Sequence, residues 1–293
     1  MQMLSMTIPN TYAGRTVASV LKECFGVSET YLRQLKTRPG SVLKNGEPVY
    51  VVARVEVGDT VSFDPSDEKR VPIRPIPFPI PVVFDDEWLT VVDKPKNLSV
   101  HPARDPDEPT VENALAAMLS GTDNPHPVSR LDKSTTGLMA IAKSGYVHSL
   151  MKRQQADGRY RKRYLAIVCG VPETKHFFIE APIGAKPGST YQREVRSDGA
   201  SAKSECTVLD TRNGLSLCEL IPHTGRTHQL RVHMAYLGFP LLGDWLYGQR
   251  SETADRPLLH AASLSFEHPV THAPVELTAP LPDDFLNYFP SEQ

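Results

Sequence analysis

One carboxylate in a short hydroxyl-rich segment is the first candidate for chemistry in this chain. Asp132 lies in the segment 129–138, SRLDKSTTGL, where it follows an arginine and a leucine and precedes small hydroxyl residues and an apolar run. The pattern predicts a turn that delivers the carboxylate to the end of a buried strand. A lone aspartate in such a turn is commonly structural, because its side chain bonds nearby backbone amides. A catalytic role therefore needs support from other parts of the chain.

A second segment, 223–238, offers a charge partner for that acid. It reads HTGRTHQLRVHMAYLG, and its apolar residues recur at helical spacing from position 230 onward. We expect Thr227 to cap the helix and Gly238 to end it. Arg231 adjoins the apolar face, and a buried arginine is rare unless it is paired with an acid. Asp132 is a candidate for that acid.

Basic residues gather in the segment 152–163, although the chain as a whole has 32 Lys+Arg against 34 Asp+Glu and a net charge of −2. Asp157 is the one acid among six basic residues there. This local excess indicates an anion-binding face. An ordinary solvated helix end, where cations stabilise the helix dipole, explains it equally well. Tyr164 follows directly and begins a predicted strand.

Composition narrows the class of protein. With 293 residues, 40% of them hydrophobic, the chain can bury one large core, or a large core and a small one. The four cysteines are far apart and form no C-x-x-C pair, so we expect reduced thiols in the cytoplasm. The N-terminal sequence lacks the features of a secretion signal, and no apolar run reaches about 18 residues. We therefore expect no membrane association.

Residues 1–64 are expected to form a small module of two helices followed by short strands. Helical spacing at 15–25 predicts the first helix, Ser28 is a candidate cap of the second, and Asn45-Gly46 predicts a hairpin turn. The basic residues of the second helix are Arg33, Lys36 and Arg38. They indicate either a solvated face or a phosphate-binding face.

Six prolines punctuate residues 65–81 and predict an extended, semi-rigid linker without helix. We therefore expect the large domain to span residues 82–293. Thr110 and Ser144 are its predicted helix caps. The alternating segments at 202–209, 215–221, 258–266 and 275–278 predict strands.

Five segments of the large domain, taken in order, resemble the motifs of the RluA family of RNA pseudouridine synthases. They are VVDKPKNLSVHP, SRLDKSTTGLMAIAKS, RKRYLAIVCG, LIPHTGRTHQLRVHMAYLG and LLHAASLSFEHP. Residues 15–63 more loosely resemble the alpha-L RNA-binding domain shared with a ribosomal small-subunit protein. The resemblance implies an α+β protein. Its catalytic domain would have a mixed, mainly antiparallel central sheet flanked by helices, preceded by a small N-terminal α/β RNA-binding module.

The resemblance also implies an isomerase that breaks the uracil–ribose bond of a uridine in structured RNA and rejoins the base through carbon, without cofactor or metal. Ribosomal RNA is the favoured partner, transfer RNA stays open, and no obligate protein partner is implied. Asp132 would either attack the sugar's anomeric carbon or remove a sugar proton. Tyr164 would stack on the base and assist the late proton transfer, and Arg231 would pair with Asp132.

The resemblance also implies that further residues contact the RNA substrate. Arg130 would fill the gap left when the target nucleotide leaves its stack. The other residues expected to contact RNA are Lys94, Arg226, His228, Arg33, Lys36, Arg38, Lys152, Arg153, Arg161 and Lys162. One departure concerns Ser129, which stands where the family usually has histidine before Arg-Leu-Asp. We expect it to affect local packing or substrate choice.

Four other interpretations are weaker. DKSTTG is similar to an aspartyl-phosphate motif, but its hydroxyl spacing is shifted, no magnesium-binding acid cluster accompanies it, and Gly243-Asp244 is only a decoy. A glycosidase needs a second carboxylate across the scissile bond, and neither Asp85-Asp86 nor Asp244 has the context for it. The histidines lack metal-ligand spacing. A non-catalytic RNA-binding or ribosome-assembly factor is the main alternative, and the joint presence of Asp132, Tyr164 and Arg231 argues against it.

Overall fold

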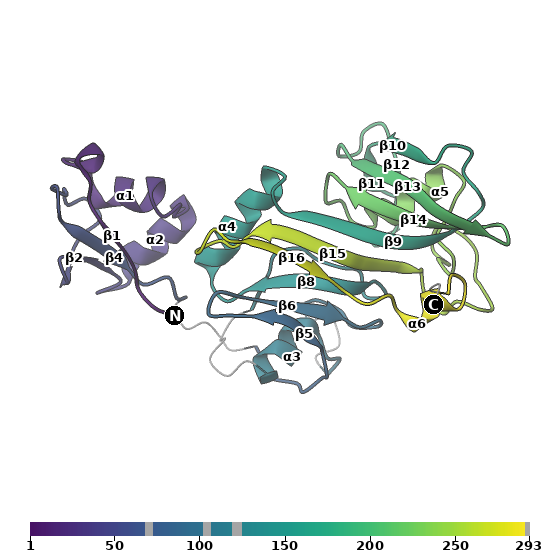
Figure 1. Cartoon of the computed structure of the whole chain (residues 1–293), viewed down its shortest axis with the longest axis horizontal. Coiled ribbons are helices and arrows are strands. Elements are labelled where there is room, and N and C mark those ends of the chain that lie inside the picture. The colour runs from purple at the N-terminus through teal and green to yellow at the C-terminus, as the bar shows by residue number, and fades with distance from the viewer. Residues whose placement is uncertain (68–72, 102–106, 119–124, 291–293) are drawn as a thin grey trace.

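In the computed structural model, which describes residues 1–67, 73–101, 107–118 and 125–290, the N-terminal part of the chain forms two α-helices and a four-stranded antiparallel sheet (Figure 1). The sheet order is β1-β4-β2-β3. Its elements in chain order are β1 (Leu4–Thr7), the short 3-10 helix η1 (Asn10–Tyr12), α1 (Val17–Glu23), α2 (Glu29–Thr37), β2 (Val42–Lys44), β3 (Glu47–Pro48) and β4 (Thr60–Phe63). Strand β1 was not expected from the sequence.

Local sequence signals explain the helices and the turn of this part. The hydroxyls of Thr16 and Ser28 accept hydrogen bonds from backbone amides three residues later, at 3.2 Å each, so both cap a helix. Asn45 and Gly46 both have positive φ and make the tight turn between β2 and β3. The predicted Ser28 cap and Asn45-Gly46 turn are therefore confirmed.

The N-terminal part packs directly against helix α4 (Gly145–Ala156) of the rest of the chain. The ring of Tyr146 on α4 lies 5.1 Å from Phe63 and 5.7 Å from Tyr31, and its hydroxyl donates to the Phe25 carbonyl at 2.7 Å. Gly26 has a φ of +67°, and a Cβ there would lie 2.8 Å from the Arg153 guanidinium. The two parts therefore share one apolar core as well as the proline-rich connection.

A ten-stranded mixed sheet forms the centre of the large part of the chain (Figure 1). Its main path runs β10-β13-β14-β9-β15-β8-β6-β5, with β16 paired to β15 and β7 paired to β8. The strands are β5 (Val82–Asp85), β6 (Leu89–Lys94), β7 (His126–Pro127), β8 (Thr136–Ala142), β9 (Arg161–Cys169), β10 (His176–Glu180), β13 (Lys203–Arg212), β14 (Leu215–Pro222), β15 (Leu259–Glu267) and β16 (Pro274–Thr278). A separate ribbon joins β11 (Ile183–Ala185) and β12 (Arg193–Val195).

The pairing of β8 with β15 is parallel, and the other pairings of the described strands are antiparallel. Every residue of β8 is buried, as expected for a strand covered on both faces. Gly137 has a φ of +108°, and a Cβ at this position would lie 2.4 Å from the Ala261 carbonyl oxygen. Only glycine lets β8 approach β15 this closely. The expected mixed, mainly antiparallel sheet in an α+β protein is confirmed.

Short helices flank this sheet, namely α3 (Val111–Met118), α4, α5 (Gln229–Tyr236) and α6 (Asp283–Leu286). Thr110 and Ser144 cap α3 and α4 as predicted, by accepting from the amides of Asn113 and Val147. The predicted Thr227 cap is wrong, because His228 is the N-cap of α5 and adopts a left-handed conformation with a φ of +57°. Across the part of the chain that the structure describes, none of the helices is long and apolar enough to traverse a bilayer.

Candidate active site

Asp132 lies in the turn that leads into the buried strand β8. The amide of Thr135 donates to the Asp132 carbonyl at 3.0 Å and closes this turn. The carboxylate itself is one-quarter exposed, with 26% side-chain accessibility. It faces a cavity of about 1350 Å³ that is bordered by the Asp132 turn, α4, β9 and the start of α5. The turn thus presents a carboxylate to a space large enough for a nucleotide.

Two acids hold Arg231 at the edge of this cavity. Its Nη1 donates to Asp132 Oδ2 at 3.2 Å, while Nε and Nη2 donate to the two oxygens of Asp244 at 2.7 and 2.8 Å. The Asp244 side chain has no exposed surface, and Arg231 has 7%. The bidentate contact fixes the guanidinium plane, so that one N–H remains directed at Asp132. The sequence argument found the pairing with Asp132 but treated Asp244 as a decoy.

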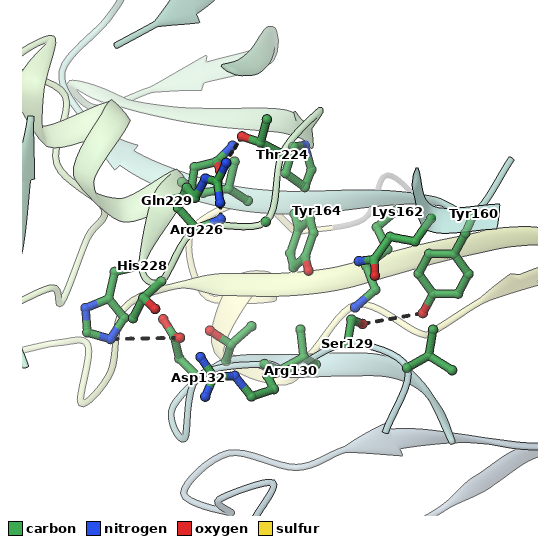
Figure 2. Close-up of a pocket in the computed structure, with 18 of the residues that line it drawn as sticks. Ser129, Arg130, Asp132, Tyr160, Lys162, Tyr164, Thr224, Arg226, His228 and Gln229 are labelled. Atoms are coloured by element: carbon green, nitrogen blue, oxygen red, sulfur yellow. Dashed lines mark hydrogen bonds and ion pairs between the residues drawn. The ribbon is translucent and has the colours of Figure 1, made fainter. Parts of the chain in front are cut away.

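His228 also lies next to Asp132 (Figure 2). Its Nε2 lies 3.9 Å from Asp132 Oδ1, and its Nδ1 lies 2.7 Å from the Tyr247 hydroxyl. That hydroxyl also accepts from the Arg193 amide, and its own proton can be donated to Nδ1 in the tautomer that carries the imidazole proton on Nε2. Burial lowers the pKa of His228 below its usual value, so the ring is neutral at physiological pH. The neutral ring offers Asp132 a dipole rather than a second full charge.

Strand β9 and the residue before it send three large side chains to the cavity, from Tyr160, Lys162 and Tyr164. Their alternation is the ordinary period of a strand, in which the intervening arginines at 161 and 163 are exposed. Burial raises the pKa of Tyr164 far above its usual value, so its side chain is a neutral phenol. The Tyr160 hydroxyl lies 3.5 Å from Ser129 Oγ. Tyr164 therefore offers a flat apolar ring beside Asp132.

Six exposed cationic side chains line the cavity mouth, namely Arg130, Lys133, Lys152, Arg161, Arg163 and Arg226. Two of them are paired with acids, Lys133 with Glu108 and Arg163 with Glu219. Arg226 is held by a 3.0 Å bond from Nε to the Ser201 carbonyl, and Arg161 by a 3.1 Å bond from Nε to the Gly158 carbonyl. Exposed guanidinium groups anchored at one nitrogen keep other N–H groups free for phosphate.

The structure corrects the expectation for Lys94. This side chain is buried, and its Nζ donates to the carbonyl oxygens of Pro95, Leu98 and Lys133 at 2.9 to 3.0 Å. Burial, reinforced by the charge of Arg256, lowers its pKa to about 7. Lys94 thus cannot reach an RNA backbone, and it instead secures the turn next to Asp132.

Two other expectations for basic residues are also revised. Arg38 pairs with Asp64 and donates to the Ser66 carbonyl, and its side chain is only 16% exposed. Lys162 is buried rather than displayed on the surface. By contrast, Arg153 is exposed, and its guanidinium lies near Gly26 at the contact between the two parts of the chain. Arg33 and Lys36 on α2 are also exposed, as a solvated or phosphate-binding face requires.

Sequence reasoning missed Arg256 as a support of the same turn. Its guanidinium is fully buried and forms a bidentate pair with Asp284 at 2.7 and 2.9 Å. Its Nη1 also donates to the Ser134 carbonyl at 3.2 Å. Two buried cations, Lys94 and Arg256, therefore bind the carbonyls of the two residues that follow Asp132. Among the residues that the structure describes, no group of three or more His, Cys, Asp or Glu is arranged to hold a metal ion.

Known proteins are similar to this chain in sequence and fold. The family model described as RNA pseudouridylate synthase matches residues 89–236. The chain is 34% identical over 272 residues to the uncharacterized RNA pseudouridine synthase YjbO of Bacillus subtilis, covering 91% of this chain and 96% of that protein. It is 32% identical over 304 residues to the ribosomal large subunit pseudouridine synthase D of Vibrio cholerae, covering 97% of this chain and 93% of that protein. Human RNA pseudouridylate synthase domain containing 1 has a TM-score of 0.58 and 27% identity, over 69% of this chain and 83% of that one.

Proposed function

This chain belongs to the RNA pseudouridylate synthase family and is an enzyme that isomerises uridine in RNA; on that premise we propose that Asp132 is its essential carboxylate and that ribosomal RNA of the large subunit is its substrate. The observation that carries the proposal is the 3.2 Å contact between Arg231 and Asp132 at the wall of the cavity that Tyr164 also lines.

The reaction sets three demands, and the cavity residues answer each of them. The bond between C1′ and N1 must break, which requires a group that attacks the anomeric carbon or removes a sugar proton, and Asp132 can do either. The carboxylate must be held in one orientation, which Arg231 and its partner Asp244 do. The detached base must stay in place while it turns, and the Tyr164 ring gives it a surface for stacking.

The RNA must also extrude its target nucleotide, at a cost of a few kcal/mol. The exposed cations at the cavity mouth are suited to hold the phosphates on either side of it, and Arg130 is suited to occupy the vacated stack. The N-terminal part of the chain would add affinity through Arg33 and Lys36. Large-subunit ribosomal RNA is proposed because a relative that aligns with 97% of the chain carries that substrate in its name. The proposed place of action is the cytoplasm.

The test uses RNA that carries tritium at C5 of uridine. That position loses its hydrogen when it bonds to C1′, so tritium release to water reports the reaction directly. We expect release from transcripts of large-subunit ribosomal RNA, and Asp132→Asn should reduce it below detection while leaving RNA affinity within about twofold. Asp210→Asn is the matched control, because Asp210 lies outside the cavity lining and its side chain, paired with Arg212, is 43% exposed.

Normal release by Asp132→Asn would refute the assignment of the carboxylate. Release from transfer RNA but not from ribosomal transcripts would refute the substrate while leaving the catalytic assignment intact. Chemical mapping of pseudouridine along the product RNA then locates the modified position.

A further inference from the structure

Lys162 stands out among the residues of the cavity because its charged end has no partner. Its Nζ is buried, and it forms no hydrogen bond with any residue that the structure describes. The residue as a whole is 8% exposed. Burying an ammonium without a partner costs several kcal/mol, and buried lysines are rare for that reason. An ammonium buried at such a cost is a candidate for contact with a bound substrate.

The surroundings of Nζ indicate which part of the substrate it would contact. Nζ lies 5.9 Å from the centre of the Tyr160 ring and 6.0 Å from that of Tyr164, and Figure 2 shows Lys162 between the two. It shares the inward face of β9 with Tyr164, and both line the cavity that Asp132 faces. A planar base stacked on Tyr164 would therefore lie within reach of the ammonium.

Two considerations favour a base over a phosphate as the partner. Exposed Arg130, Arg161 and Arg226 already border the cavity mouth, where a backbone would run. The amine is also poorly suited to attract RNA at a distance, since burial and the neighbouring charge of Lys152 lower its pKa to about 7. In its protonated form the amine has three N–H donors and no acceptor, so on the edge of uracil it can bond only a carbonyl oxygen, and negative charge developing on that oxygen favours the protonated form.

We propose that Lys162 is a further catalytic residue of this site, which donates a hydrogen bond to a carbonyl oxygen of the uracil base held on Tyr164. The inference rests on the proposed function and assigns the group that receives the base. When the C1′–N1 bond breaks, its electron pair leaves with N1, and the base carries a negative charge spread over N1 and both carbonyl oxygens. A fixed donor at one of these oxygens stabilises that charge more than it stabilises neutral uridine, and therefore accelerates the bond cleavage.

The test compares Lys162→Met with wild type in single-turnover tritium release at saturating RNA. Methionine keeps most of the length of the side chain and removes the donor. We expect the rate to fall roughly 100-fold, the cost of deleting one such donor. RNA affinity and its salt dependence should stay within about twofold, because no phosphate contact is lost. Thermal stability should be equal or higher, since an unpartnered buried charge has gone. Lys175→Met, at an exposed lysine outside the cavity lining, should behave as wild type.

RNA with 2-thiouridine or 4-thiouridine at the target position identifies the carbonyl. Sulfur is a weak acceptor, so one of the two substitutions should slow wild type and have little further effect on Lys162→Met. Equal thio effects in both proteins would overturn the proposed contact. A normal rate for Lys162→Met would overturn the catalytic role, and weakened binding with a reduced salt slope would identify a phosphate contact instead. Failure of the proposed function is distinguishable, because wild type itself would then release no tritium.

Discussion

The pair formed by Arg231 and Asp244 should prove as important as Asp132 itself, and Asp244→Asn tests this. Asparagine has nearly the same shape but removes the charge and turns one of the two acceptors into a donor. The Arg231 guanidinium would then be buried with one of its two bonds to position 244 lost and only Asp132 as a charged partner. Removing one member of a buried ion pair costs about 3–5 kcal/mol.

The lower end of that range applies here, because asparagine retains one acceptor. Neither side chain is more than 7% exposed, so solvent screening does not reduce the effect. At about 2.1 cal/mol/K of unfolding entropy per residue, a loss of about 3 kcal/mol lowers the Tm of this 293-residue chain by roughly 5 °C. Differential scanning calorimetry measures this change.

Activity should fall as well, because the guanidinium plane that orients Asp132 is no longer fixed. We expect single-turnover tritium release to slow by roughly tenfold to 100-fold, a cost typical of misplacing a catalytic group by about 1 Å. The rate must be measured well below the Tm of the variant. Asp255→Asn is the matched control, since Asp255 forms an ion pair with Lys96 and is 63% exposed. Such a pair contributes about 1 kcal/mol at most. An unchanged Tm or an unchanged rate in Asp244→Asn would refute the reasoning.

Two further predictions concern other parts of the chain. Since burial lowers the pKa of Lys162 to about 7, the unfolded chain binds more protons between that pH and the usual pKa of 10.5. Wild type should therefore gain stability relative to Lys162→Met as the pH rises from 7 to 10, by up to a few kcal/mol, and parallel denaturation curves across this range would contradict the shift. Tyr146→Ala should loosen the contact with Phe63 and Phe25, exposing the proline-rich connection to limited proteolysis and weakening RNA affinity, whereas Tyr146→Phe should keep the contact.

Some features of the site were predictable from the sequence because they follow from local or pairwise rules. Ser28, Thr110 and Ser144 cap helices, as expected of hydroxyl residues immediately before helical apolar patterns. The partnership of Arg231 with Asp132 followed from the rule that a buried arginine needs an acid.

Other features depend on how distant segments meet. The same rule did not reveal that Arg231 has two acids, because Asp244 lies in a loop with no periodic pattern. Lys94 was expected to contact RNA because its residue type implies charge, whereas its position at the end of β6, between β8 and β5, decides its burial. The inward orientation of Lys162 could have been predicted from the sequence, since Lys162 lies two residues before Tyr164 on an alternating strand. Thr227 failed as a cap because His228 adopts a left-handed backbone conformation.

Helix α4 has a consequence for how a substrate would be selected. One of its sides, with Tyr146 and Leu150, is in contact with the N-terminal part of the chain, while Lys152 and Gln155 on another side border the cavity. The separation between the basic face of α2 and the carboxylate of Asp132 is therefore set by a rigid element rather than by the length of a linker. An RNA bound at both places must present its uridine at a fixed distance from the element held by α2. Because α4 fixes this distance, the choice of uridine depends on the three-dimensional shape of the RNA as much as on its sequence.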